Sequence, residues 1–100
     1  MKVIIKKTGE NIVVLARALG YIPKGYVGEE FEMSRPIASR PYPHFHIYAK
    51  EDKKQGIVLL NLHLDQKKPS YKGALAHSGE YEGPIVEQET ERIKRILEVK

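Results

Sequence analysis

The chain contains two strictly alternating segments, His44-Phe45-His46-Ile47-Tyr48-Ala49 and Leu60-Asn61-Leu62-His63-Leu64-Asp65. The segment between them from Lys50 to Gly56 is charged, ends in glycine and contains no apolar residue. Alternation with a period of two indicates a strand with one buried face, and a polar segment ending in glycine is typical of a turn. The pattern therefore predicts a β-hairpin with a loop of several residues.

Strand alternation assigns the side chains of this hairpin to two faces. Phe45 and Ile47 must share a face with the leucines, because a slip by one residue would expose a whole apolar set. If the loop is centred near Lys53, Phe45 lies opposite Leu62 and His44 lies opposite His63. Polar residues then share the other face: His44, His46, Tyr48, Asn61, His63 and Asp65.

Apolar spacing predicts a helix on each side of the hairpin. In the first, Ile12, Leu15, Ala16 and Leu19 recur every three or four residues, with Thr8 as the N-cap and Gly20 as the stop. The alternative is a tight turn at residues 8–11 that leads into a strand over residues 12–14.

The second helix opens at Gly83-Pro84, because proline favours the first helical position. Its expected buried stripe consists of Ile85, Val86, Ile93, Ile96 and Leu97. A third strand is predicted at Glu30–Arg35, where Phe31 and Met33 alternate with polar neighbours.

Together these elements predict an α+β fold: a three-stranded antiparallel sheet with an N-terminal helix and a C-terminal helix packed on one face. The 100 residues, 41% apolar and 30% charged, suit a single domain over residues 1–100 with one core. The longest apolar run near the start has three residues, far short of a signal-peptide core or a membrane span. We therefore expect a soluble, cytoplasmic protein that does not enter membranes.

The chain has no cysteine, so a transition metal would have to be held by imidazole and carboxylate groups. His44, His46 and His63, with Asp65 as a ligand or as a partner of the ligands, could converge on one divalent ion, zinc or manganese. The alternative is a solvated polar face, which antiparallel hairpins often have.

A long segment without helical or strand periodicity, residues 66–83, follows the second histidine strand. Such segments are often functional, and this one could fold back over the polar face. Its lysines Lys67, Lys68 and Lys72 would bind phosphate groups, while Tyr71, Tyr81 and His77 are candidate catalytic residues. The alternative is an ordinary surface loop with Tyr71 anchored in the core.

The chain contains Phe45-His46-Ile47-Tyr48, then Leu60-Asn61-Leu62-His63-Leu64-Asp65-Gln66-Lys67-Lys68-Pro69-Ser70-Tyr71, and then Ala76-His77-Ser78-Gly79-Glu80-Tyr81-Glu82-Gly83 before a charged helix. These motifs resemble a family of small bacterial proteins from candidate-phylum lineages that has no assigned activity. Because the family has no assigned activity, the resemblance implies no catalytic residue.

His44-Phe45-His46 is similar to the His-hydrophobic-His motif of HUH endonucleases, which implies a metal that orients a scissile phosphate for a helix-borne tyrosine. This chain departs from that pattern, because Tyr71 and Tyr81 precede the predicted last helix. It also looks short for the five-stranded sheet of those enzymes.

The sequence alone does not decide between catalysis and binding. One hypothesis is a metal-dependent phosphodiesterase or nuclease-like protein that uses the histidine cluster. A second is a non-catalytic module that binds nucleic acid or protein, with Tyr48, Tyr71 and Tyr81 stacking on bases. A third is a structural or toxin-like small protein that acts through its apolar surface. The net charge of +4 permits an anionic partner but also suits a solvated surface. An exposed sheet edge would permit a homodimer.

Overall fold

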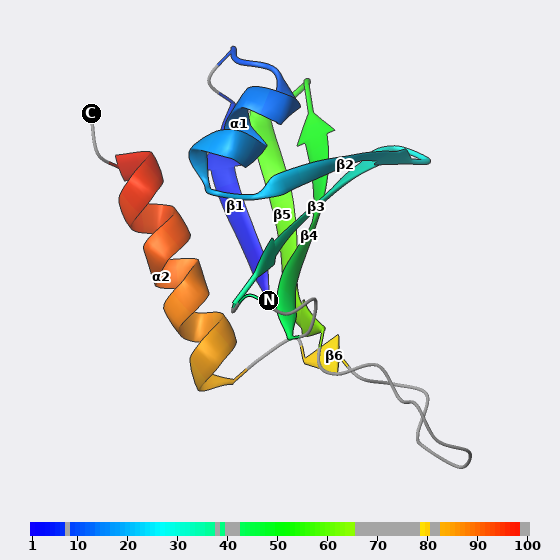
Figure 1. Cartoon of the computed structure of the whole chain (residues 1–100). Helices are drawn as coiled ribbons and strands as arrows, with labels where there is room; N and C mark the ends of the chain where they lie inside the picture. The colour runs from blue at the N-terminus through cyan, green and yellow to red at the C-terminus, as the bar shows by residue number, and fades with distance from the viewer. Residues whose placement is uncertain (8, 38, 40–42, 66–78, 81–82, 99–100) are drawn as a thin grey trace.

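One antiparallel sheet and two helices make up the computed structural model, which describes residues 1–7, 9–37, 39, 43–65, 79–80 and 83–98 (Figure 1). The elements are β1 (Lys2–Lys6), α1 (Ile12–Ala18), β2 (Ile22–Val27), β3 (Glu30–Pro36), β4 (His44–Asp52), β5 (Ile57–Asp65), β6 (Gly79–Glu80) and α2 (Pro84–Glu98). The sheet order is β1-β5-β4-β3-β2, and the two-residue β6 pairs with β5. The predicted α+β class is confirmed, whereas the prediction of three strands is wrong, because five long strands are present.

The central hairpin β4–β5 is present, but its predicted register is wrong by two residues. Phe45 lies opposite Leu64 and His46 lies opposite His63, instead of Phe45 opposite Leu62. The reason is the position of the turn: Asp52 pairs with Ile57, so the loop is centred between Lys54 and Gln55. Because the shift is an even number of residues, the two faces keep the predicted membership.

The two long strands that were not predicted lie at the edges of the sheet. β1 pairs with β5, with Val3 opposite Leu60. β2 pairs with β3, and its register shifts between Pro23 and Gly25. Proline and glycine weaken a strand pattern, but an edge strand tolerates them at a bulge. The chain is therefore long enough for five strands, contrary to the expectation from its length.

The first helix begins later than predicted. Its N-cap is Asn11, whose Oδ1 accepts a hydrogen bond of 3.0 Å from the backbone N–H of Val14. The predicted cap Thr8 lies outside the described residues. The alternative strand over residues 12–14 is wrong, because these residues belong to α1. Gly20, with a φ of 83°, follows the helix as predicted.

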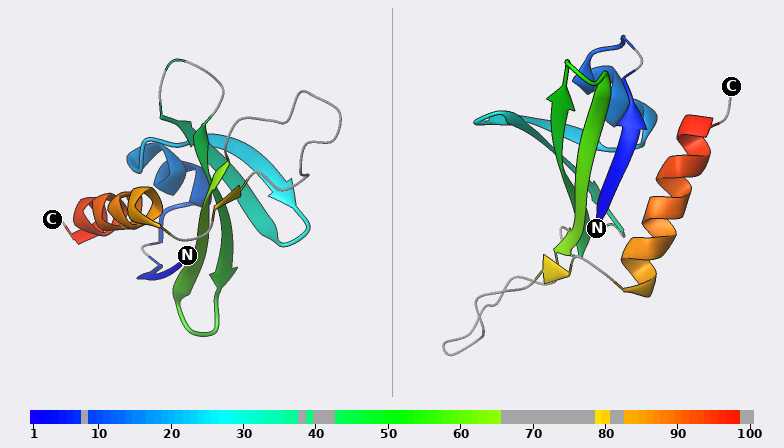
Figure 2. Two further views of the ribbon diagram at one scale, coloured as in Figure 1. Left: turned by 90° about the horizontal axis from the view of Figure 1, so that it is seen from below. Right: turned by 180° about the vertical axis from the view of Figure 1, so that it is seen from behind.

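Both helices pack on the apolar face of the sheet (Figure 2). α2 begins at the predicted Pro84. Its Val86 and Ile93 are buried in the same core as Leu15 of α1 and the apolar side chains of the sheet, such as Leu60. Ile85 was predicted to be buried as well, but half of its surface is exposed. In the described part of the chain, neither helix has the length and apolar character needed to cross a membrane.

A buried carboxylate joins α2 to the rest of the fold. Glu89 Oε2 accepts hydrogen bonds from the Tyr21 hydroxyl at 2.5 Å and from Arg92 Nη2 at 2.8 Å. Arg92 Nη2 also donates to the carbonyl oxygen of Leu19 at 2.7 Å, and Arg35 Nη1 lies 3.3 Å from Glu89 Oε1. A buried charge is tolerated only with such partners. The network therefore fixes the position of α2 against the end of α1.

Candidate metal centre

The polar face of the sheet is built from rows of residues that lie opposite one another on neighbouring strands. One row crosses four strands, β2 to β5, and consists of Ile22, Ser34, His46 and His63. The next row consists of Pro36, His44 and Asp65. Directly opposed residues share a face, so pairing alone brings these imidazoles and the carboxylate together.

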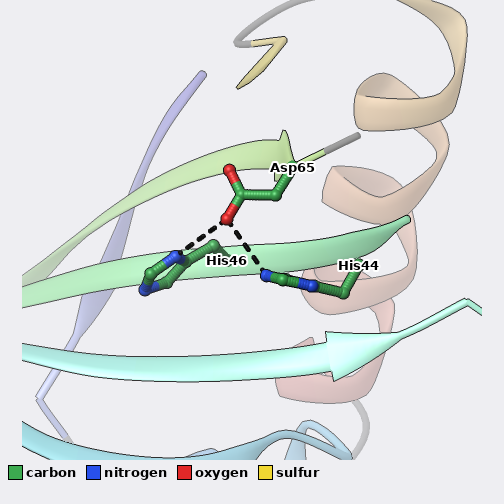
Figure 3. Close-up of side chains that lie close together, drawn as sticks. All are labelled: His44, His46 and Asp65. Atoms are coloured by element: carbon green, nitrogen blue, oxygen red, sulfur yellow. Dashed lines mark hydrogen bonds and ion pairs between the residues drawn. The ribbon is translucent and has the colours of Figure 1, made fainter. Parts of the chain in front are cut away.

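Three of the four predicted metal ligands converge on one point (Figure 3). Asp65 Oδ2 lies 3.0 Å from His44 Nε2 and 3.2 Å from His46 Nδ1. All three ligand atoms lie within 4.8 Å of one another. Around a tetrahedral zinc ion with bonds of about 2.0–2.1 Å, neighbouring ligand atoms are separated by about 3.3 Å. His44, His46 and Asp65 could therefore hold a metal ion.

The fourth predicted ligand, His63, contacts Asp65 from the other side. Its Nε2 lies 2.9 Å from Asp65 Oδ1, and it does not belong to the group of three converging atoms. Although only 5% of its surface is exposed, it lies on the polar face, with its ring centroid 5.0 Å from that of His46. Burial lowers the pKa of His63, although Asp65 opposes that effect. A neutral His63 that donates to Asp65 fits this position.

A residue that the sequence analysis did not assign to the site, Glu32, completes it. Glu32 Oε1 lies 3.0 Å from His46 Nε2, while His46 Nδ1 faces Asp65. Both nitrogens of one imidazole therefore face carboxylate oxygens. Alternation in β3 could have assigned Glu32 to a polar face, but only the pairing of β3 with β4 brings it to His46.

The ring of Tyr48 packs on the histidines. Its centroid lies 4.5 Å from that of His46 and 5.5 Å from that of His63, with interplanar angles of 24° and 20°. Part of its aromatic surface is thus in contact with other side chains of the protein, and the stacking of Tyr48 on a base stays a prediction.

A groove of about 430 Å³ adjoins the converging atoms. Its walls are largely apolar, and it is lined by Ile22, Lys24, Glu32, Ser34, Pro36, His44 and His46. Two of the three converging side chains, His44 and His46, therefore face a space that a ligand could enter.

The remaining predicted site residues lie outside the described residues: Lys67, Lys68, Lys72, Tyr71, Tyr81 and His77. Their proposed roles in phosphate binding and catalysis stay predictions. Of the long segment that contains them, Gly79 and Glu80 pair with the end of β5 as β6, opposite Asp65 and Leu64. These two residues extend the sheet at its edge.

Comparison of the chain with protein-family models, with curated proteins and with solved structures gave no match. The resemblances to the small bacterial family and to HUH endonucleases therefore stay predictions. What the chain can do has to be argued from the site itself.

Proposed function

We propose that this protein is a metal-dependent phosphoesterase, with a divalent transition metal held by His44, His46 and Asp65. Imidazole and carboxylate oxygen are ligands that zinc accepts, and two histidines with one carboxylate leave a coordination position open. These side chains are only partly exposed, at 18% for His44, 16% for His46 and 25% for Asp65, so their geometry is restricted.

The single observation that carries the proposal is the surroundings of His46. A neutral imidazole has one donor and one acceptor nitrogen, yet both nitrogens of His46 lie near carboxylate oxygens, which only accept when ionised. Two states satisfy both carboxylates: an imidazolium, which carries an N–H on each nitrogen, or an imidazole with a metal at Nδ1, whose Nε2–H then donates to Glu32. A histidine that binds a metal usually donates its other N–H to a carboxylate or carbonyl oxygen in this way.

The two carboxylate oxygens of Asp65 also face different partners. If Oδ2 binds the metal, Oδ1 remains free to accept the hydrogen bond from His63 Nε2, 2.9 Å away. Glu32 and His63 would then each hold one ligand in orientation without binding the ion. A divalent metal here would polarise a phosphoryl oxygen and lower the pKa of water in its open position to about 7. The groove beside His44 and His46 would hold the ester.

The alternative, a module that binds nucleic acid without catalysis, would use the basic net charge and not a metal. Its affinity should survive a chelator and fall steeply with salt. Of its three predicted stacking residues, Tyr48 is already in ring contact with His46 and His63, and Tyr71 and Tyr81 lie outside the described residues.

Metal-dependent stabilisation tests the proposal directly. Thermal and urea unfolding should be followed with zinc, manganese or nickel and with EDTA, for the wild type, Asp65→Asn and Asp52→Asn. The two aspartates end β5 and β4 respectively, so Asp52→Asn is a matched control at the opposite end of the hairpin. A metal at 100 times its dissociation constant should add about 2.7 kcal/mol to the wild type and to the control, but not to Asp65→Asn.

Activity is then measured on bis(p-nitrophenyl) phosphate and p-nitrophenyl phosphate with the metal that stabilises most. We expect turnover that EDTA abolishes and that Asp65→Asn lacks. If no metal stabilises the wild type, the metal centre is wrong. If a metal binds but neither ester is hydrolysed, the site binds metal without phosphoesterase activity.

A further inference from the structure

We infer that Lys24 is the anion-binding residue of this site, and that the groove takes a small organic phosphate monoester with an apolar group. The phosphate would lie between Lys24 and the metal position, and the apolar group would rest on Ile22 and Pro36. The inference depends on the proposed metal centre and specifies which substrates that centre accepts.

A bulge in β2 presents Lys24 to the groove. Pro23 pairs with Met33, and Gly25 already pairs with Glu32, so Lys24 is the extra residue between two consecutive positions of β3. Bulges of this kind redirect a side chain and are frequent beside active sites. Lys24 lines the same groove as Glu32, His44 and His46.

Lys24, like most of the described lysines, forms no ion pair, whereas Lys7 and Lys50 do. Lys7 pairs with Glu51 at 3.2 Å, and Lys50 pairs with Glu29 at 3.3 Å. Among the described residues, no carboxylate lies within ion-pair distance of Lys24, although Glu32 lines the same groove. A divalent metal would balance the two carboxylates Asp65 and Glu32. Lys24 would then supply the remaining positive charge for an anion.

The size and walls of the groove indicate the rest of the ligand. A volume of about 430 Å³ lies within the range of roughly 300–1,000 Å³ that is typical of small-molecule sites. Ile22, half exposed, lies opposite Ser34 across the β2–β3 pair, so an apolar surface and a hydroxyl are neighbours. Ser34 could donate to a phosphate oxygen while Ile22 contacts an aromatic or aliphatic group.

Calorimetric titration with phenylphosphonate, an analogue of phenyl phosphate whose P–C bond a phosphoesterase does not hydrolyse, tests the inference on the zinc-loaded protein, with Lys24→Met, Lys24→Arg and Lys54→Met as variants. Lys54 lies in the exposed turn at the other end of the hairpin and serves as the control. Lys24→Met should lose roughly 10- to 100-fold in affinity, the value of one charge-assisted hydrogen bond. Lys24→Arg should keep most of the affinity, and Lys54→Met all of it.

Two further ligands separate the parts of the inference. Inorganic phosphate lacks the apolar group and benzoate lacks the phosphorus-centred anion, so both should bind more weakly than phenylphosphonate. Equal binding of inorganic phosphate would overturn the role of Ile22 and Pro36, and equal binding of benzoate would overturn the preference for a phosphate-like group. Unchanged phenylphosphonate affinity in Lys24→Met would overturn the role of Lys24.

The stabilisation by zinc of each variant distinguishes this inference from the metal proposal. Lys24 is not a proposed ligand, so zinc should stabilise Lys24→Met as much as the wild type. If zinc stabilises both proteins but phenylphosphonate binds neither, only the present inference is wrong. If zinc stabilises neither, the metal centre is wrong and the inference is wrong with it.

Discussion

Glu32 Oε1 lies 3.0 Å from Nε2 of His46, although the two residues are fourteen positions apart in the chain and on different strands. The contact fixes which nitrogen of His46 is available on the side of Asp65. If Glu32 holds the N–H at Nε2, Nδ1 presents a lone pair to the point where His44 and Asp65 also converge. In the proposed metal centre, Glu32 would therefore influence the metal affinity without contributing to the three converging atoms.

We expect Glu32→Ala to weaken metal binding by about 10- to 100-fold, the usual effect of removing a carboxylate that orients a metal-binding histidine. Glu32→Gln should lose less, because its amide oxygen still accepts a hydrogen bond. Competition with a chromophoric chelator measures both. Glu30→Ala, on the same strand and face, is the control, and equal losses in the Glu30 and Glu32 variants would refute the role of Glu32.

The number of imidazole ligands is a second prediction. Because His63 contacts Asp65 Oδ1 and not the converging atoms, X-ray absorption at the zinc edge should show two imidazoles, not three. His63→Gln keeps an N–H donor and should retain zinc with reduced affinity, whereas His44→Ala should lose it. A count of three imidazoles, or complete loss of zinc in His63→Gln, would make His63 a ligand.

Alkaline unfolding should report on Tyr21. Burial, and then the hydrogen bond to Glu89, raises the pKa of Tyr21 far above its ordinary value of 10.0. At pH values below 10.0, Tyr21 is neutral in the folded and the unfolded protein, and its contribution to stability is complete. Above pH 10.0, the Tyr21 hydroxyl ionises in the unfolded chain but not in the folded protein, so the free energy of unfolding falls by up to about 1.36 kcal/mol per pH unit.

The Tyr21→Phe variant tests this dependence. At neutral pH it should be about 1–3 kcal/mol less stable, because Glu89 loses a buried donor. That deficit should shrink as the pH rises from about 9 to about 11, since the variant lacks the ionising hydroxyl. Chemical unfolding at several pH values measures the difference, and Tyr26→Phe, at a mostly exposed tyrosine, is the control. A deficit that stays constant would contradict the raised pKa.

Adjacent leucines on β5 test the assignment of faces. Leu60 is fully buried in the core, while Leu59 lies half-buried on the opposite face, opposite Ile4 and Lys50. Leu60→Ala should therefore cost about 2–5 kcal/mol in the free energy of unfolding. Leu59→Ala should cost well under half of that. Similar losses for the two variants in urea unfolding would contradict the alternation.

Alternation in β4 and β5 was enough to predict the central hairpin and the members of its polar face, because a period of two fixes the direction of each side chain. It was not enough for the register, which depends on the turn. Asp52 accepts hydrogen bonds from the backbone and side-chain nitrogens of Gln55, and this turn places the pairing two residues away from the predicted register. As a result His46, and not His44, lies opposite His63, and His44 lies opposite Asp65.

The edge strands and the residues they contribute could not be predicted from local patterns. β1 has a short apolar run between lysines, and it is a strand because β5 offers an open edge. β2 contains Pro23 and Gly25, whose preferences indicate a turn, and the bulge that presents Lys24 exists only through pairing with β3. Glu32 and Lys24 were missed for the same reason, because each reaches the site only through pairing between strands: β3 with β4 for Glu32, and β2 with β3 for Lys24.

The pairing of Gly79 with Asp65 has a consequence for how the sequence can vary. Asp65 and Gly79 are direct partners, so the two described residues that flank positions 66–78 are held together at one candidate metal ligand. Added length between two paired residues costs little chain entropy, since each doubling adds only about 0.6 kcal/mol. Insertions between Asp65 and Gly79 should therefore leave Asp65 opposite His44.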